Sequence, residues 1–562
     1  MQIPEMVETE PTQIPVAIVG GGPVGLMLAL FLDFHGVASV VFNAEASTRW
    51  HPKGSTEGSR TMEHFRRLGI AADIRKLGLP ADHPTDVAYF TRFGGVELAR
   101  LRMPSANEVL RQVARSPVTD QVPEPIHRAN QMYVERFLFE HAKGRPTIVM
   151  RFGWRVESFA QDRDGVRLAS VREADGATQA WRARYLVGCD GGRSLVRRSL
   201  GIRFRGEAGI EQRYFGGRMF STYVRVPELY REYLGHRRAW QYWAVNPEIR
   251  SSLIAVDGKD EFLFRTRASE PDKPPDDAAV ADAMRRCVGT AIATEIVAHE
   301  PWTAGMALVA ERFADRRVFL AGDAIHLFTP TGGFGMNTGV DDAANLAWKL
   351  AAMTQGWGGH ELLRSYEAER MPVASRNTEA ARQLTANIGE TDIDGAIERD
   401  TPAGAAARRA AGAMLAGFGE QFASLGVQLG ARYDGSPIVC DDGAPPADDL
   451  VAYVPTSIPG GRAPHIWLDD GRTIGSSLYD RLGTGFALVR LGPRAPDAAA
   501  IVAAAVRRKI PLEVVDVPGS QARELYGCDL ALIRPDQYVG WRGNHVPTEP
   551  DRVWAQLLGF AM

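Results

Sequence analysis

The stretch VAIVGGGPVG, residues 16–25, decides the fold of this 562-residue chain. A β-branched run leads into Gly20, Gly22 and Gly25, spaced G-x-G-x-x-G, and an apolar helix is expected to continue to about Phe34 before a second strand. In such a βαβ unit the first glycine permits a tight turn, the second lets a pyrophosphate approach the backbone, and the third lets helix and strand pack closely. The stretch therefore predicts a dinucleotide site at the N-terminus of a helix.

Two residues compete for the adenosine ribose of that dinucleotide. The motif places an acidic residue near the end of the second strand, about 20 residues after the glycines. Asn43 stands at this point, and Glu45 follows it closely. Either side chain can bond a ribose hydroxyl. We favour Glu45, and the alternative is that Glu45 is a solvated loop residue.

Composition describes a folded protein of about three domains. Lys plus Arg is 65 and Asp plus Glu is 68, so the net charge of -3 gives no general attraction to nucleic acid or to an anionic membrane. Hydrophobic residues make up 45% and charged residues 24%, the balance of a globular chain. The first fourteen residues are acidic and polar, and we expect a loose tail and not a signal peptide.

The four cysteines, Cys189, Cys287, Cys440 and Cys528, lie far apart in the sequence, without a CxxC pair. Neither a disulfide framework nor a zinc site is predicted, and a reducing, cytoplasmic location is expected.

The fold class that we predict is α/β. Further sequence patterns divide the chain into domains. Period-2 alternation after Phe204 predicts an antiparallel sheet, an alanine-rich run predicts a connecting helix, and Pro/Gly/Asp-rich loops precede a small α/β unit. The expected parts are a tail (1–14), a discontinuous Rossmann-like domain (15–203 and 301–375), a substrate sheet domain (204–300, with possible inserts from 76–125), a helical linker (376–433) and a C-terminal domain (434–562).

Two further glycine-rich segments follow the first in order. They are GCDGGRSLVRRSLGI from Gly188 and RVFLAGDAIHLFTPTGGFGMNTGVDDAANLAWKL from Arg317. With the first stretch, they closely resemble the single-component flavoprotein aromatic hydroxylases, the group that includes p-hydroxybenzoate hydroxylase. The resemblance spans about residues 15–375.

The resemblance implies FAD as the cofactor, with its phosphates at the first motif. It implies that Asp323 holds the ribitol and that the ring edge lies near Gly333 to Asn337. Related sequences usually show HPR where this chain has HPK, so Lys53 keeps the charge near the phosphates and loses the bidentate fork. The implied cofactor residues are Gly20, Gly22, Gly25, Glu45, Lys53, Gln131, Asp190, Asp323, Pro330, Gly333, Gly335, Met336 and Asn337.

Several polar residues near these motifs have a structural alternative. Small residues before an expected helix, Val340–Ala352, would allow close approach to a planar ring, and Asp341 and Asp342 would then be helix-cap residues of its first turn. For Asp190, a role as a turn cap and a role as a cofactor contact are equally supported by the sequence. His326 invites a role as general base, and packing under the flavin loop is favoured.

By this resemblance the chain is an FAD-dependent monooxygenase that consumes NADPH or NADH and transfers oxygen from a flavin C4a-hydroperoxide to an electron-rich phenolic or polycyclic aromatic ring. The alternatives are a flavin-dependent halogenase or oxidase, and a non-catalytic binding protein on the same fold. A possible homodimer is expected, without a nucleic-acid or membrane partner. Arg218, His236 and Tyr242 are the candidate catalytic residues, because they lie in the expected substrate sheet domain.

The C-terminal region resembles the thioredoxin-like extension of the larger phenol- and polyketide-hydroxylating members. The resemblance rests on PGGRAPHIWL from Pro459 and LIRPDQYVGWRG from Leu532. Because a CxxC pair is absent from the sequence, we expect this domain to serve packing or subunit contact and not dithiol chemistry.

Overall fold

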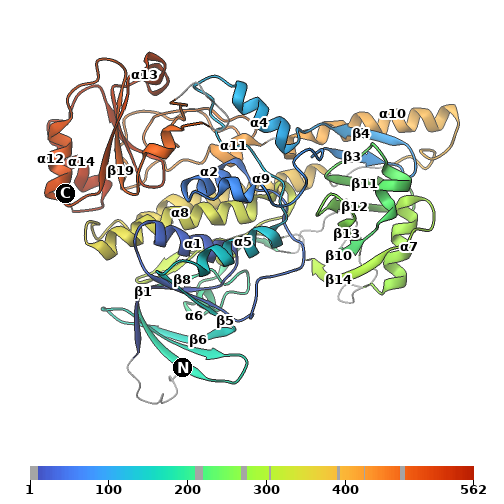
Figure 1. The fold of residues 1–562 in the computed structure, drawn as a ribbon, viewed down its shortest axis with the longest axis horizontal. Coiled ribbons are helices and arrows are strands. Elements are labelled where there is room, and N and C mark those ends of the chain that lie inside the picture. Colours follow the sequence, from blue (N-terminus) through green and yellow to red (C-terminus); the bar gives the residue numbers. More distant parts are fainter. Residues whose placement is uncertain are drawn as a thin grey trace.

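The structure is a computed structural model that describes residues 11–208, 219–267, 275–302, 306–388, 393–422, 424–468 and 475–561. Figure 1 shows a central part that contains the long helices α8 (Phe334–Gln355) and α9 (Ser365–Ile388), a second sheet on one side of it, and the C-terminal part on the other. Within the described residues, no helix is both long and apolar enough to cross a membrane.

The first sheet is mostly parallel, and its order is β16-β17-β8-β1-β2-β5. The central strand β1 pairs in parallel with both β2 and β8. Strands β6 and β7 extend the sheet from β8 in antiparallel fashion. The bounds are β1 (Thr12–Val19), β2 (Ser39–Asn43), β5 (Ile148–Phe152), β6 (Trp154–Gln161), β7 (Val166–Arg172), β8 (Thr178–Gly188), β16 (Ala314–Asp315) and β17 (Val318–Leu320).

Strand β1 begins earlier than the sequence predicts. Thr12, Gln13 and Ile14, which we assigned to the tail, pair with residues 181–183 of β8. Strand β8 is long enough to supply backbone hydrogen-bond partners to these three residues. These hydrogen bonds stabilise the strand although Thr12 and Gln13 are polar.

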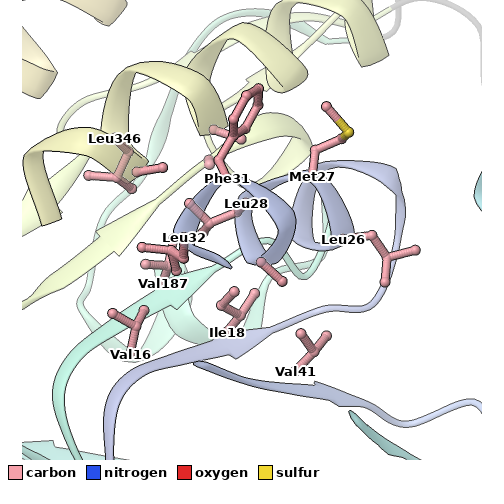
Figure 2. Packing of buried hydrophobic residues seen from close by; sticks show 14 of the residues in the cluster. Val16, Ile18, Leu26, Met27, Leu28, Phe31, Leu32, Val41, Val187 and Leu346 are labelled. Carbon is pink, nitrogen blue, oxygen red and sulfur yellow. The ribbon is translucent and has the colours of Figure 1, made fainter. Parts of the chain in front are cut away.

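The core of this part lies between the sheet and α8. Helix α1 (Pro23–Phe34) fills that space and is buried on nearly every side. Figure 2 shows Leu28 and Leu32 of α1 between the strand residue Val187 and Leu346 of α8. A helix enclosed by a sheet and a second helix must be apolar all round, which explains the unbroken apolar run of α1.

Helix α8 corrects one prediction. It begins at Phe334, well before the expected start at Val340, because Gly332 and Gly333 adopt left-handed φ values of 83° and 68° that turn the chain into the helix. Asp341 and Asp342 therefore lie inside the helix, buried, and are not residues of its first turn.

The second sheet has the order β14-β10-β13-β12-β11-β3-β4. Its neighbours pair antiparallel, as expected, except that β3 pairs with β11 in parallel. Strands β3 and β4 come from the region 76–125. The bounds are β3 (Val87–Phe90), β4 (Glu97–Leu101), β10 (Met219–Arg225), β11 (Gln241–Val245), β12 (Arg250–Ala255), β13 (Glu261–Arg267) and β14 (Glu295–Trp302).

The C-terminal part is a four-stranded sheet of order β20-β19-β21-β22 with helices packed on it (Figure 1). Its core continues into α8, because Trp348 of α8 packs edge-on against Phe486 of β19 with ring centroids 5.9 Å apart. The bounds are β19 (Phe486–Leu491), β20 (Leu512–Val517), β21 (Leu530–Ile533), β22 (Val539–Gly543), α12 (Ala499–Arg507), α13 (Ser520–Tyr526) and α14 (Pro550–Leu557). The expected connecting helix is present as α10 (Pro402–Ala416).

Candidate functional site

A cleft of about 600 Å³ opens at the carboxyl ends of the parallel strands. This is where open α/β sheets bind their ligands. All three glycine-rich segments contribute to its walls. The lining includes Gly20, Gly22, Asn43, Glu45, Arg49, Lys53, Gln131, Glu135, Cys189, Asp190, Arg193, Arg198, Asp323 and Met336.

The three glycines of the first motif differ in what a side chain would meet. At Gly20, which has a φ of +112°, a Cβ would lie 2.2 Å from the carbonyl oxygen of Cys189, and at Gly25 it would lie 1.9 Å from the carbonyl oxygen of Gly20. At Gly22 a Cβ would meet no described protein atom within 4 Å. Packing therefore explains Gly20 and Gly25, whereas the open space at Gly22 matches a position kept free for a phosphate.

The N-terminus of α1 supplies donors to this space. Gly22 is the N-cap residue, no side chain caps the helix, and the first turn holds no acidic residue. Arg49, Lys53, Arg193 and Arg198 line the same cleft. Free amides at a helix start together with several cations fit an anionic pyrophosphate.

The ribose position favours Glu45 over Asn43. The side-chain oxygen of Asn43 accepts the N–H of Gly21 at 3.2 Å, and its amide donates to the carbonyl of Glu45 at 3.1 Å. Asn43 thus shapes the glycine turn. Glu45 is exposed and lines the cleft, and its contact to a ribose hydroxyl stays a prediction.

Asp323 lies in a 3-10 turn, Gly322–Ala324, directly after β17, and its side chain opens on the cleft. The walls withdraw bulk solvent and raise the pKa of Asp323, while His326, Lys53 and Arg49 oppose that rise. A carboxylate at this depth suits the hydroxyls of a ribitol chain.

Two other predicted cofactor residues line the cleft and also hold its wall. The N–H of Gln131, the first residue of α5 (Gln131–Lys143), donates to the carbonyl of Gly54 at 2.7 Å, which joins α5 to the Lys53 loop. Asp190 accepts the Ser194 hydroxyl and the N–H of Val196, so the cap that we predicted for it is present, on different donors. Their contacts to the cofactor stay predictions.

The remaining predicted ring-contact residues form the turn before α8. Pro330 and Gly333 bound the 3-10 turn Thr331–Gly333, and Gly335 and Met336 lie in the first turn of α8. Met336 reaches the cleft.

Asn337 ties this turn to the segment before α2 (Ser59–Arg67). Its side-chain oxygen accepts the N–H of Gly58 and the hydroxyl of Thr61, and its amide donates to the carbonyls of Thr56 and Gly333. The hydrogen bonds of the Asn337 side chain therefore hold the turn in place. We expect any contact of this turn with a flavin ring to come from its backbone.

Of the three candidate catalytic residues, the structure describes Tyr242 and His236, which have different surroundings. Arg218 lies outside the described residues. Tyr242 is fully buried in β11, where its oxygen accepts the N–H of Ala239 at 2.6 Å and burial raises its pKa. His236 is exposed in a turn after the helical segment Leu229–Leu234.

A buried ionic cluster supports the Asp323 turn from behind. Asp342 accepts the N–H of Gly322 at 3.2 Å and pairs with His326 at 2.7 Å, which confirms packing as the role of this histidine. The guanidinium of Arg370 binds both Asp341 and Asp342. Our prediction of cap roles for the two aspartates was wrong, because they are counter-ions of an arginine from α9. Two adjacent acids inside an apolar helix were the signal that could have revealed this.

Sequence reasoning also missed Arg128 and Trp240, which connect the cofactor part to the second sheet. The indole N–H of Trp240, just before β11, donates to Ser55 Oγ at 3.2 Å. The guanidinium of Arg128 lies 3.8 Å from the centroid of the Trp240 ring and donates to the hydroxyl of Thr56. The segment 55–56 thereby contacts both the turn before α8 and the sheet.

This cleft and fold are typical of a dinucleotide-binding protein with a second sheet beside the cleft. A family model described as FAD binding domain matches residues 13–381, and one described as aromatic-ring hydroxylase, C-terminal, matches residues 456–561. The chain belongs to this family of FAD-dependent aromatic-ring hydroxylases, and the expected fold class is confirmed.

Known FAD-dependent monooxygenases are similar to this chain along nearly its whole length. The FAD-dependent monooxygenase apdD of Emericella nidulans is 32% identical, with 99% of this chain and 93% of that protein covered. Phenol 2-monooxygenase of a Pseudomonas species is 29% identical, with 98% and 93% covered. The rebeccamycin biosynthetic enzyme RebC, solved with reduced flavin, has a TM-score of 0.87 and 34% identity and covers 98% of this chain and 100% of its own. The chain is therefore an FAD-dependent monooxygenase of aromatic rings.

Proposed function

We propose that the enzyme hydroxylates a phenolic or polycyclic aromatic ring, with NADPH or NADH as the reductant and dioxygen as the source of the new oxygen. The observation that carries this proposal is the contact of the cofactor loop with the second sheet through Ser55 and Trp240. Because of this contact, the turn proposed to hold the flavin ring is next to the second sheet. That sheet can cover a planar substrate. Similarity to phenol 2-monooxygenase supports the phenolic class.

When bound, FAD supplies the two-electron reduction and the activation of dioxygen that protein side chains cannot provide. The chain binds and orients it. The α1 amides and nearby cations hold the phosphates, Asp323 holds the ribitol, and the turn before α8 presents backbone amides to the ring. The first residues of α8 add positive helix potential, worth typically about 0.3–1 kcal/mol, toward an anionic reduced ring.

The overall reaction balances as one ring C–H, one dioxygen, one reduced nicotinamide and one proton giving one ring C–OH, one water and one oxidised nicotinamide. Oxygen transfer of this kind needs an electron-rich carbon, so the ring substrate should carry an oxygen donor. The reductant would bind briefly at the surface, because the sequence holds one G-x-G-x-x-G fingerprint and the cleft suits FAD. We further propose a cytoplasmic enzyme, which agrees with four free cysteines, and a homodimer is a possible assembly.

The test is the mass of the product formed under labelled dioxygen. Purified, FAD-loaded enzyme is supplied with NADPH or NADH and a panel of phenols and hydroxylated polycyclic aromatics. We expect one labelled oxygen in the product for each nicotinamide consumed. Nicotinamide oxidation that yields only hydrogen peroxide across the panel would contradict a hydroxylase, and a halide-dependent product would identify a halogenase.

A further inference from the structure

Arg128 is a buried cation at the meeting point of the cofactor part and the second sheet. It lies between the bridge that pairs Glu57 with His127 and the start of α5, and only 6% of it is exposed. Its guanidinium stacks on Trp240 and donates to the hydroxyl of Thr56.

Among the described residues, the partners of this guanidinium are all neutral. Nη1 donates to the hydroxyl of Thr56, Nη2 contacts the sulfur of Met103 at 3.7 Å, and Nε has no hydrogen-bond partner among the described residues. Several other buried arginines hold carboxylates: Arg370 binds Asp341 and Asp342, and Arg462 binds Glu63. Arg197, which is also buried, donates to two backbone carbonyls instead. Burial without a compensating carboxylate lowers the pKa of Arg128 to about 9.

A buried cation without a nearby anion costs free energy, and an anion that binds beside it recovers that cost. The stacked indole of Trp240 compensates part of the cost. Because Nε has no hydrogen-bond partner and no carboxylate of the described residues pairs with Arg128, the guanidinium has capacity for one more acceptor, which should carry negative charge.

Arg128 also lies close to the turn at which the flavin ring is expected. The carbonyl of Thr56 accepts the amide of Asn337 at 3.0 Å, and a Cβ on Gly333 would lie 3.4 Å from Cβ of Thr56. On the other side, Trp240 continues directly into β11 of the sheet. An anion bound by Arg128 would therefore lie between the cofactor turn and the sheet, where the proposed function requires the substrate.

We propose that Arg128 binds the ionised oxygen of the aromatic substrate, a phenolate or an aryl carboxylate, and so selects acidic aromatics. This inference rests on the proposed function, because it names the substrate class of that same site. A free phenol has a pKa near 10, so at neutral pH it is mostly protonated. A guanidinium beside the oxygen favours the phenolate. The phenolic proton passes to water, Arg128 keeps its own protons, and the ring becomes richer in electrons.

The test compares pairs of ligands of similar size and shape, in which one member can ionise and the other is neutral. Dissociation constants for the oxidised, FAD-loaded enzyme are measured by titration calorimetry for para-nitrophenol against para-nitroanisole, naphthoate against naphthamide, and anthraquinone carboxylate against its carboxamide. We expect the wild type to prefer the ionised member of at least one pair. In Arg128→Gln the ionised member should bind roughly ten- to hundredfold more weakly, while the neutral one is nearly unchanged. Arg128→Lys should retain part of the preference.

Arg237→Gln is the matched control. Arg237 also stacks on an aromatic ring, Phe90, with its guanidinium 4.9 Å from the centroid, and it donates to backbone carbonyls. The same loss of charge at this position should leave every preference in place.

Two further measurements distinguish other roles of Arg128. Because its charge is not balanced by a carboxylate, Arg128→Gln should leave the Tm of the ligand-free enzyme unchanged or raise it. A large fall in Tm with unchanged ligand preference would assign Arg128 to packing and overturn the proposal. A shift of the flavin reduction potential with unchanged preference would assign it to the cofactor, and would also overturn it.

If the wild type prefers no ionised member of any pair, the proposal is wrong whatever the enzyme hydroxylates. Conversely, a clear preference that depends on Arg128, together with a failure to incorporate labelled oxygen, would support the anion site and contradict the proposed function.

Discussion

At the scale of single residues, one motif contains glycines that are required for different reasons. A side chain at Gly25 would collide with the backbone of Gly20, whereas one at Gly22 would enter the open cleft. Gly22 also has extended backbone angles, φ -77° and ψ -177°, that other residues adopt freely. The requirement at Gly22 is therefore a requirement of the ligand.

We predict that Gly22→Val weakens FAD binding by roughly tenfold or more, about 1.4 kcal/mol, and leaves the Tm of the apoprotein unchanged. Gly25→Val is the contrasting variant, and it should destabilise the apoprotein itself by about 1–3 kcal/mol or more. Flavin titration of the apoprotein and thermal unfolding measure the two effects. Normal FAD affinity in Gly22→Val would show that the phosphates lie elsewhere.

Asp323 is predicted to position the cofactor and not to transfer a proton. Asp323→Ala should lose roughly tenfold in FAD affinity, because a charged hydrogen-bond acceptor facing the cleft disappears. With saturating FAD the yield of product per nicotinamide should recover. A variant that binds FAD normally and loses only the chemical step would contradict this role.

Glu57 is a buried carboxyl whose two oxygens have no hydrogen-bond partner among the described residues. Burial raises its pKa to about 8 in the folded protein. The folded state therefore keeps a proton that the unfolded state releases near pH 4, so this group makes folding less favourable as pH rises from about 4 to about 8. Glu57→Gln should remove that decline and raise the free energy of unfolding at neutral pH. Denaturant titrations across this pH range measure it, and a decline of equal size in the variant would contradict the prediction.

At the scale of elements, α8 and α9 are joined by ions inside the protein. Arg370 of α9 holds Asp341 and Asp342 of α8, and Asp341 also pairs with His64 of α2 at 2.9 Å. Although burial alone would raise the pKa of Asp341, the guanidinium and the His64 hydrogen bond hold it well below its ordinary value. The cluster fixes the helix whose first turn borders the cofactor cleft through Met336.

We predict that Arg370→Gln lowers the free energy of unfolding by about 3–5 kcal/mol, because two buried carboxylates lose the guanidinium that they share. In the wild type the depressed carboxyl pKa values give stability that is complete above about pH 4 and is lost as pH falls further. The acid dependence should be shallower in Arg370→Gln. Unfolding in denaturant at several pH values measures both effects, and an unchanged stability would mean that the cluster contributes nothing net.

At the scale of the whole molecule, the C-terminal part supports the cofactor part through buried contacts. Arg534 donates to Glu369 of α9 at 2.6 and 2.8 Å, and Arg462 pairs with Glu63 of α2. Trp348 of α8 completes the C-terminal core. These contacts indicate a structural role for the C-terminal sheet.

We predict that Cys440→Ser combined with Cys528→Ser leaves turnover intact. Both thiols are free, and burial raises their pKa values to about 12 and about 11, which suppresses the reactive thiolate. Steady-state kinetics with a thermal unfolding control measure the effect. A large loss of activity at unchanged Tm would reveal a redox role.

The sequence by itself determined the features whose causes are local. Glycine spacing, the apolar run of α1 and the period-2 segments specify the FAD fold and the position of the cleft, because a turn, a helix face or a strand is encoded within a few neighbouring residues. Only the tertiary structure decided which charges meet. Arg370 with Asp342 and Arg462 with Glu63 are pairs brought together by packing, and the start of α8 at Phe334 depended on backbone angles of Gly332 and Gly333 that composition does not reveal. For the same reason, the residues next to Arg128 in the sequence do not indicate that it is a buried cation. Its burial follows from the packing of the second sheet, through Trp240, against the cofactor loop.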